Sequence, residues 1–224
     1  MIRPLRSYLL IAMLMMANAA GSQTMKEKEP MPLGKELEGL ASGPRIAYLR
    51  YLLTSGRRDA EVFFQLGVAF YDAERIDSAM SYYAKAVAID PQLSKAYVNM
   101  GVVLDEVHRS GEAAEMFEKA VEANPLDILA HSYLANLLLD AGQHEAASSH
   151  LSRAFAIDSL HPQPHFSLAL FFWESGMFRE SLVEWENVVR LAPASYLAKK
   201  AEENTAILRG ALSGGGEGAP LPRR

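Results

Sequence analysis

The sequence predicts an all-α protein, an α-solenoid of four 34-residue helix–turn–helix repeats with a capping helix at each end. The first observation behind this prediction is a constant period, because Pro91 and Pro125 lie one 34-residue step apart and Pro125 and Pro193 two such steps. The second is that the pair Leu66–Gly67 returns one period later as Met100–Gly101. The third is that apolar residues recur at steps of three and four, as on one face of a helix. A fixed period of this length favours a binding surface over an active site.

Small residues at fixed positions predict how the helices pack. Ala79 and Ala86 of the first repeat return as Ala113 and Ala120 in the second. Side chains this small let two helices approach closely, and large ones such as Tyr83 fill the remaining space. Each predicted helix has only about 13 residues, which is marginal in isolation, so stacking must stabilise it.

The segments on either side of the repeats are predicted to cap the array. Before the repeats, Pro44 suits the first position of a helix and Gly56 its end. After them, a helix is needed because the last pair would otherwise expose its stacking face. We therefore expect a signal peptide at 1–19, a flexible leader at 20–41, an N-terminal capping helix at 42–58, repeats at 60–93, 94–127, 128–161 and 162–195, a C-terminal capping helix at 196–212 and a disordered tail at 213–224.

The first residues have the three-part pattern of a secretory signal peptide. Arg3 and Arg6 form a positive region, Tyr8–Ala17 is apolar, and Ala17 and Ala19 supply the small residues before a cleavage site. The apolar run is shorter than the roughly 20 residues of a membrane span. The pattern predicts an exported protein, periplasmic or extracellular, with an uncleaved anchor as the alternative.

Composition and side-chain spacing argue against several classes of function. The formal net charge of −5 disfavours a general nucleic-acid binder, and the lack of cysteine excludes disulfides, thiolate zinc sites and a cysteine nucleophile. The histidines form no compact ligand set, and His131 and His165 fall at packing positions. No carboxylate pair converges as general acid–base chemistry requires. We predict no enzyme activity, no metal and no cofactor.

The repeats resemble the tetratricopeptide repeat family, whose pattern places aromatic, small and proline residues at fixed offsets within a 34-residue unit. The first repeat fits every position, with Phe63, Leu66–Gly67, Phe70, Ala79, Tyr83, Ala86 and Pro91. The third repeat departs from the pattern at His131 and Ser159, and the fourth at Ser181 and Val188. The resemblance covers 136 of the 224 residues.

This resemblance implies a right-handed superhelix that binds peptides or proteins on its concave face, which the first helix of each pair lines. Carried onto this sequence, the lining positions are Phe64, Val68, Tyr71, Asp72, Val98, Asn99, Val102, Asp105, Tyr133, Asn136, Leu139, Asp140, Phe166, Leu170, Trp173 and Glu174.

The lining positions suggest the chemistry of a partner. An aromatic strip would be rimmed by acids and would fit a segment with apolar anchors and some positive charge. Its members are Phe64, Tyr71, Phe166 and Trp173, and the rim is Asp72, Asp105, Glu106, Asp140 and Glu174. Two alternatives stay open: packing or the end helices could bury the aromatics, and the chain could be a structural, self-associating subunit of a cell-envelope assembly.

Overall fold

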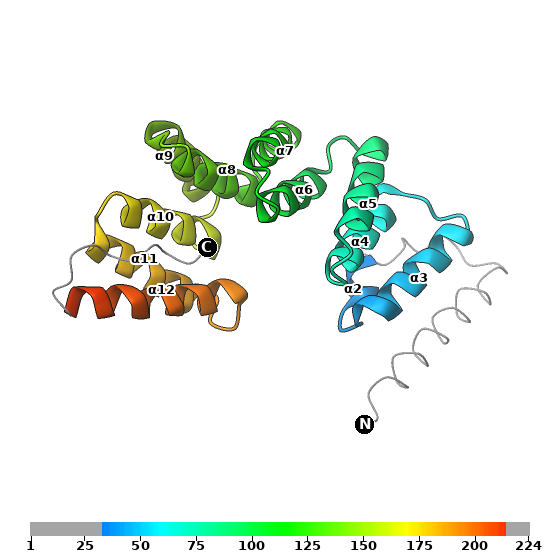
Figure 1. The fold of residues 1–224 in the computed structure, drawn as a ribbon. Coiled ribbons are helices and arrows are strands. Elements are labelled where there is room, and N and C mark those ends of the chain that lie inside the picture. Colours follow the sequence, from blue (N-terminus) through cyan, green and yellow to red (C-terminus); the bar gives the residue numbers. More distant parts are fainter. Residues whose placement is uncertain (1–32, 214–224) are drawn as a thin grey trace, which may run out of the picture. The chain divides into compact units, whose positions relative to one another are not determined.

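The computed structural model describes residues 33–213, and over that range the regular structure is entirely α-helical (Figure 1). The predicted all-α solenoid fold is confirmed. The predicted signal peptide and most of the leader and tail lie outside the described residues. The helices are α2 (Leu33–Leu37), α3 (Ser42–Thr54), α4 (Ala60–Tyr71), α5 (Ile76–Ile89), α6 (Ser94–Glu106), α7 (Ser110–Ala123), α8 (Ile128–Asp140), α9 (His144–Ile157), α10 (Pro162–Glu174), α11 (Phe178–Leu191) and α12 (Tyr196–Ser213).

The helices keep the period of the sequence. The first helices of the pairs, α4, α6, α8 and α10, begin at residues 60, 94, 128 and 162. The second helices, α5, α7, α9 and α11, begin at 76, 110, 144 and 178. Both series keep the 34-residue period, and the same step leads back from α5 to α3 and forward from α10 to α12. The two flanking helices therefore continue the register of the repeats.

The described residues divide into two compact units. Unit 1 ends at Val103 and unit 2 begins at Leu104, so α6 runs across the boundary. Within residues 33–213, no helix is both long enough and apolar enough to cross a membrane.

Close helix packing in unit 1 depends on a glycine. Gly67 on α4 faces the ring of Tyr83 on α5, and a Cβ atom at residue 67 would collide with that ring. Ala79 and Ala86 on α5 are fully buried, which agrees with the predicted role of small residues in helix approach. Tyr83 is itself buried, and its hydroxyl accepts a hydrogen bond from Asn99 Nδ2 at 3.3 Å.

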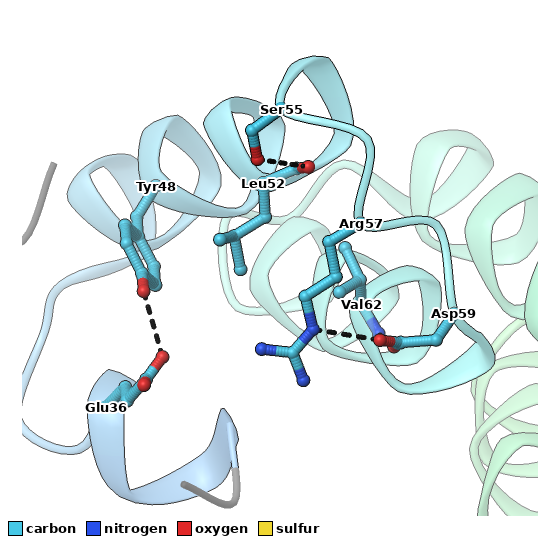
Figure 2. A network of polar contacts seen from close by, with 7 residues as sticks. All are labelled: Glu36, Tyr48, Leu52, Ser55, Arg57, Asp59 and Val62. Atoms are coloured by element: carbon cyan, nitrogen blue, oxygen red, sulfur yellow. Dashed lines mark hydrogen bonds and ion pairs between the residues drawn. The ribbon is translucent and has the colours of Figure 1, made fainter. Parts of the chain in front are cut away.

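The end of the expected leader is folded, which corrects the prediction of a flexible segment at 20–41. Leu33 and Leu37 of α2 are buried in the core of unit 1. The Tyr48 hydroxyl on α3 donates a hydrogen bond to Glu36 at 2.9 Å (Figure 2). The ends of α2 and α4 are one 34-residue period apart, so α2 and α3 occupy the positions of a shortened helix pair. The sequence interpretation missed α2 because five residues are too few to show a helical period.

Unit 2 has a core of large aromatics near its C-terminal end. Trp185 on α11 is fully buried and meets the Phe166 ring of α10 edge-to-face, with 4.8 Å between ring centroids. Ala201 and Leu208 of α12 complete the same cluster, so α12 packs on the last helix pair. Ser181 is one of the two positions at which the fourth repeat departs from the repeat pattern. Its buried hydroxyl donates a hydrogen bond to the Ala169 carbonyl oxygen at 2.8 Å, so the polar side chain is accommodated in the core.

Candidate interaction surface

Most of the predicted aromatic strip is part of the core. Phe64, Phe166 and Trp173 are only 8%, 5% and 5% exposed. In unit 1, Phe64 packs against the Tyr83 ring, and Lys95 Nζ lies 4.5 Å from the centroid of the Phe64 ring. The structure thus corrects the expectation of an open aromatic strip and favours the packing alternative for these three rings. The sequence pattern could not separate the two cases because a first helix contacts neighbours on several sides.

The remaining lining positions differ in their accessibility. Val98, Leu139 and Leu170 are buried, like the three aromatics. The half-buried positions are Val68, Tyr71, Asn99, Val102, Tyr133 and Asn136, and the exposed ones are Asp72, Asp105, Asp140 and Glu174. A partner that approached the first helices would therefore meet polar and acidic groups before apolar ones.

Two half-buried polar side chains of unit 2, Tyr133 and Asn136, lie on α8. The Tyr133 ring stacks on Phe117 with centroids 5.3 Å apart. Burial, and then the negative charge of Glu106, raise the pKa of Tyr133, so its hydroxyl stays protonated at neutral pH. One turn from Ser132, the Asn136 Oδ1 atom is buried without a hydrogen-bond partner in the described part of the chain, as is Ser132 Oγ. Unsatisfied acceptors of this kind are uncommon in folded proteins.

Carboxylates end the first helices at equivalent positions. Asp72 is the C-cap of α4, and Glu106, Asp140 and Glu174 are the last residues of α6, α8 and α10. A negative charge at a helix C-terminus interacts unfavourably with the helix dipole, so these positions do not serve helix stability. In unit 1, Arg45 of α3 neutralises Asp72 through an ion pair of 2.7 Å, a contact that sequence analysis did not foresee.

The net charge of the described residues also makes unit 2 the more acidic of the two units. The described part of unit 1 has eight Lys and Arg residues against eight Asp and Glu, whereas that of unit 2 has eight against sixteen. The acidic excess of unit 2 reinforces the three carboxylates at its helix ends, because charges of one sign add in the potential above a surface.

Histidines form contacts that the sequence interpretation treated only as packing. His131 Nδ1 lies 2.9 Å from His150 Nδ1, and His165 Nδ1 lies 2.6 Å from Glu184 Oε2. Among residues 33–213, no three His, Cys, Asp or Glu side chains come together in a way that could hold a metal ion. Comparing the second helices at the 34-residue period would have shown that His150 and Glu184 occupy equivalent positions. That comparison would have identified the partners of His131 and His165.

Comparison with known proteins identifies the family of the repeats in this chain. Two models of the tetratricopeptide repeat family match the sequence, one at residues 46–94 and the other at 106–170. The chain carries tetratricopeptide repeats. The repeats are also similar to those of curated proteins, among them the peroxisomal targeting signal receptor of Eremothecium gossypii, 27% identical over 110 residues. That match covers 49% of this chain and 19% of the receptor.

A second curated relative is a probable UDP-N-acetylglucosamine–peptide N-acetylglucosaminyltransferase, SPINDLY, of Hordeum vulgare. It is 34% identical over 122 residues, which is 51% of this chain and 13% of the transferase. The chain therefore spans less than a fifth of either relative, and the similarity concerns their repeats.

Solved structures with tetratricopeptide repeats share the fold. A thermophilic repeat protein of Thermus thermophilus is 18% identical with a TM-score of 0.57, over 88% of this chain and 97% of that one. MamA is 18% identical with a TM-score of 0.56, over 79% and 99%. YrrB, described as having an unusual peptide-binding site, is 21% identical with a TM-score of 0.52, over 74% and 84%.

Proposed function

We propose that the chain is an exported, non-enzymatic interaction module that binds a peptide or protein partner on the concave face of its superhelix, which the first helices line. Tetratricopeptide repeats are in general scaffolds for protein–protein interaction, and a similar structure, YrrB, has a peptide-binding site. The proposal of export rests on the charged, apolar and small-residue pattern of residues 1–19.

The observation that carries the proposed site is the set of carboxylates at the ends of α6, α8 and α10. Glu106, Asp140 and Glu174 are exposed and occupy the same position in three successive repeats, where a negative charge interacts unfavourably with the helix dipole. A segment with Lys or Arg side chains would complement them. We therefore propose that the partner carries basic side chains. Its apolar contacts fall on half-buried positions of unit 2 such as Tyr133, and not on the buried aromatics.

Peptide selection tests this site because it needs no identified partner. A library of random twelve-residue peptides displayed on phage would be selected on residues 20–224, and the enriched peptides measured by fluorescence anisotropy. We expect Lys and Arg to be enriched together with one or two apolar residues, and binding to weaken as salt increases.

A matched pair of variants locates the binding. We expect Glu106→Gln/Asp140→Asn/Glu174→Gln to weaken a selected peptide by about tenfold, since exposed charge pairs contribute up to about 1 kcal/mol each. The control, Glu115→Gln/Glu118→Gln/Glu122→Gln, removes three exposed carboxylates of α7 and should bind like the parent. Equal affinity in both variants, or enriched peptides without basic residues, would contradict the proposed site. Circular dichroism checks that both variants fold.

Self-association is the alternative function, and the outer face of α12 is its candidate surface. Tyr196 and Leu212 on this helix are 71% and 50% exposed. Sedimentation at increasing concentration separates the two functions: a mass that rises with concentration and falls after Tyr196→Ser would favour a self-associating scaffold. A constant monomer mass would favour the interaction module. The intact mass of the protein from the producing cells shows whether the chain begins after Ala19.

A further inference from the structure

Two successive repeats of unit 2 build the same side-chain arrangement with different chemistry. His131 on α8 and His165 on α10 are one 34-residue period apart, and so are their partners, His150 on α9 and Glu184 on α11. In each case the histidine Nε2 atom faces a backbone carbonyl oxygen six residues earlier, that of Pro125 at 3.2 Å and that of Ser159 at 3.0 Å. We call these arrangements the His–His site and the His–Glu site.

Counting protons distinguishes the two sites. In the His–His site, a carbonyl oxygen only accepts, so His131 Nε2 must carry a hydrogen. The two Nδ1 atoms are 2.9 Å apart, which leaves room for one hydrogen between them. That contact exists when both rings are neutral and when one ring is charged. It cannot exist when both rings are charged, because each Nδ1 atom would then bear a hydrogen.

The His–Glu site responds to protons in the opposite way. Both neighbours of His165 are acceptors, a carboxylate oxygen at Nδ1 and a carbonyl oxygen at Nε2. An imidazolium, which donates from both nitrogens, satisfies this arrangement completely. A doubly protonated His165 ring therefore keeps the contact between α10 and α11, in contrast to two charged rings in the His–His site.

The charges around the His–His site come from several elements. On the turn before α8 lies Asp127, and on the turn before α10 lie Asp158 and His161. Helix α10 adds His165, whose ring meets Phe155 of α9 edge-to-face, and α11 adds Glu184. On the far side of α8, the carboxylates of α7 are exposed, namely Glu112, Glu115, Glu118 and Glu122.

Two of these histidines favour the neutral state in the folded chain. Burial, and then the charge of His131, lower the pKa of His150 below its ordinary value of 6.5. Burial also lowers the pKa of His161, although Asp158 and Asp127 oppose that shift. His161 Nδ1 accepts the Gln163 N–H at 3.2 Å and so caps α10 only while Nδ1 is unprotonated.

The sign of the pH dependence follows from these directions. A histidine whose pKa is lower in the folded than in the opened chain binds fewer protons when folded. Its contribution to stability is complete above pH 6.5 and is lost as the pH falls below that value.

We propose that unit 2 contains a proton-controlled joint: acid releases α9 from α8 at the His–His site, while α11 stays held to α10 at the His–Glu site. Such a joint would let a mildly acidic compartment alter one helix pair of the unit without unfolding its C-terminal core.

Hydrogen–deuterium exchange of residues 20–224 tests the joint helix by helix. After correction for the intrinsic exchange rate, we expect amides of α8 and α9 to open about tenfold more often at pH 5 than at pH 7, since the loss of one hydrogen bond changes an opening equilibrium by about this factor. Amides of α10 and α11 beyond the first turn of α10 should change by less than about twofold. Equal acid sensitivity of both pairs, or none in α8 and α9, would overturn the proposal.

Exchanging the two chemistries gives a sharper test. His150→Glu converts the His–His site into a second His–Glu site and should abolish the tenfold acid effect in α8 and α9. Glu184→His should create the same effect in α10 and α11. If His150→Glu does not fold, His131→Phe/His150→Tyr supplies the non-titrating pair that unit 1 has at the equivalent Phe63 and Tyr82. Acid sensitivity that survives in the folded variants would show that the His–His site is not its cause.

Discussion

Units 1 and 2 place different chemistry at the same position of the repeat. In unit 1 the position holds Phe63, whose ring stacks on Tyr82 with centroids 6.3 Å apart. Tyr82 also stacks on Phe70 at 5.2 Å, and the Arg75 guanidinium lies 4.8 Å from the centroid of the Phe70 ring. In unit 2 the position holds His131 or His165 with polar partners. The same position thus accepts a pair of aromatic rings, a pair of imidazoles or an imidazole and a carboxylate, and we propose that the choice of groups decides whether the contact responds to pH.

The contrast extends to charge and to spectroscopic probes. Unit 1 is electrically balanced in its described part, whereas the described part of unit 2 has twice as many acids as bases. All six histidines and both tryptophans of the chain belong to unit 2. Tryptophan fluorescence therefore reports on unit 2 alone, and the two units can be followed separately in one sample.

The variant with the largest expected effect on stability tests whether the two units are stable independently of each other. Trp185→Ala removes a fully buried side chain from the core of α10, α11 and α12 and should lower the free energy of unfolding by about 3–5 kcal/mol. Urea unfolding followed by circular dichroism measures the loss. Hydrogen exchange should show lost protection in unit 2 while α4 and α5 keep theirs.

The control for this variant lies on the same helix. Val183 is 55% exposed, and Val183→Ala should change stability by less than about 0.5 kcal/mol. If Trp185→Ala removed protection equally from α4 and α5, the two units would unfold together and the comparison between them would fail.

The next effect concerns the close approach of helices in unit 1. Gly67→Ala should destabilise the protein by about 1–3 kcal/mol because the added methyl group overlaps the Tyr83 ring. Unit 2 has Ala135 and Ala169 at the equivalent position, opposite Leu151 and Trp185. Gly210→Ala is the matched control, since a methyl group there meets open space and should stabilise α12 by about 0.5–1 kcal/mol. Thermal unfolding of both variants measures the difference, and a neutral Gly67→Ala would show that Tyr83 moves aside easily.

The variant with the smallest expected effect on stability extends the comparison of pH dependence between the units to alkaline pH. Burial, opposed by the hydrogen bond from Asn99, raises the pKa of Tyr83 from 10.0 to about 12, with a further contribution from Asp72. The folded chain then holds this proton where the unfolded chain has lost it, so stability falls as the pH rises from 10 through 12. Tyr83→Phe should cost about 1 kcal/mol at pH 7, through the lost hydrogen bond, and remove this part of the alkaline decline. Urea unfolding at pH 7 and pH 11 checks both statements, and an unchanged decline in the variant would contradict the assignment to Tyr83.

Several elements could be predicted closely from the sequence. The repeats were expected to begin at residues 60, 94, 128 and 162, and α4, α6, α8 and α10 begin there, because the 34-residue spacing fixes the start of each pair. The role of Ala79 in close helix packing followed from the same spacing. In contrast, α2 was not predicted because its five residues are too few to show a helical period, although Leu33 and Leu37 are buried in the core of unit 1.

The candidate surface was predicted only in part. The positions of Asp140 and Glu174 on first helices were correct, since position within a repeat follows from counting. The exposure of Phe64, Phe166 and Trp173 was not, because a large ring on a first helix can turn toward its own pair, as Phe166 does toward Trp185. Burial of one side chain depends on its neighbours in space, and these come from three different helices.

The sequence alone determined the helices, their pairing and the positions they repeat, because a helix pair depends on local periodicity and on small residues at fixed spacing. Only the tertiary structure decided which repeated positions are open to a partner and which pairs of polar groups meet. The contacts of His150 and Glu184 are visible only in the structure, where α9 and α11 bring these residues within hydrogen-bonding distance of His131 and His165. The physical reason is that hydrogen bonds and burial act over a few ångströms, and packing brings residues 19 positions apart within that range.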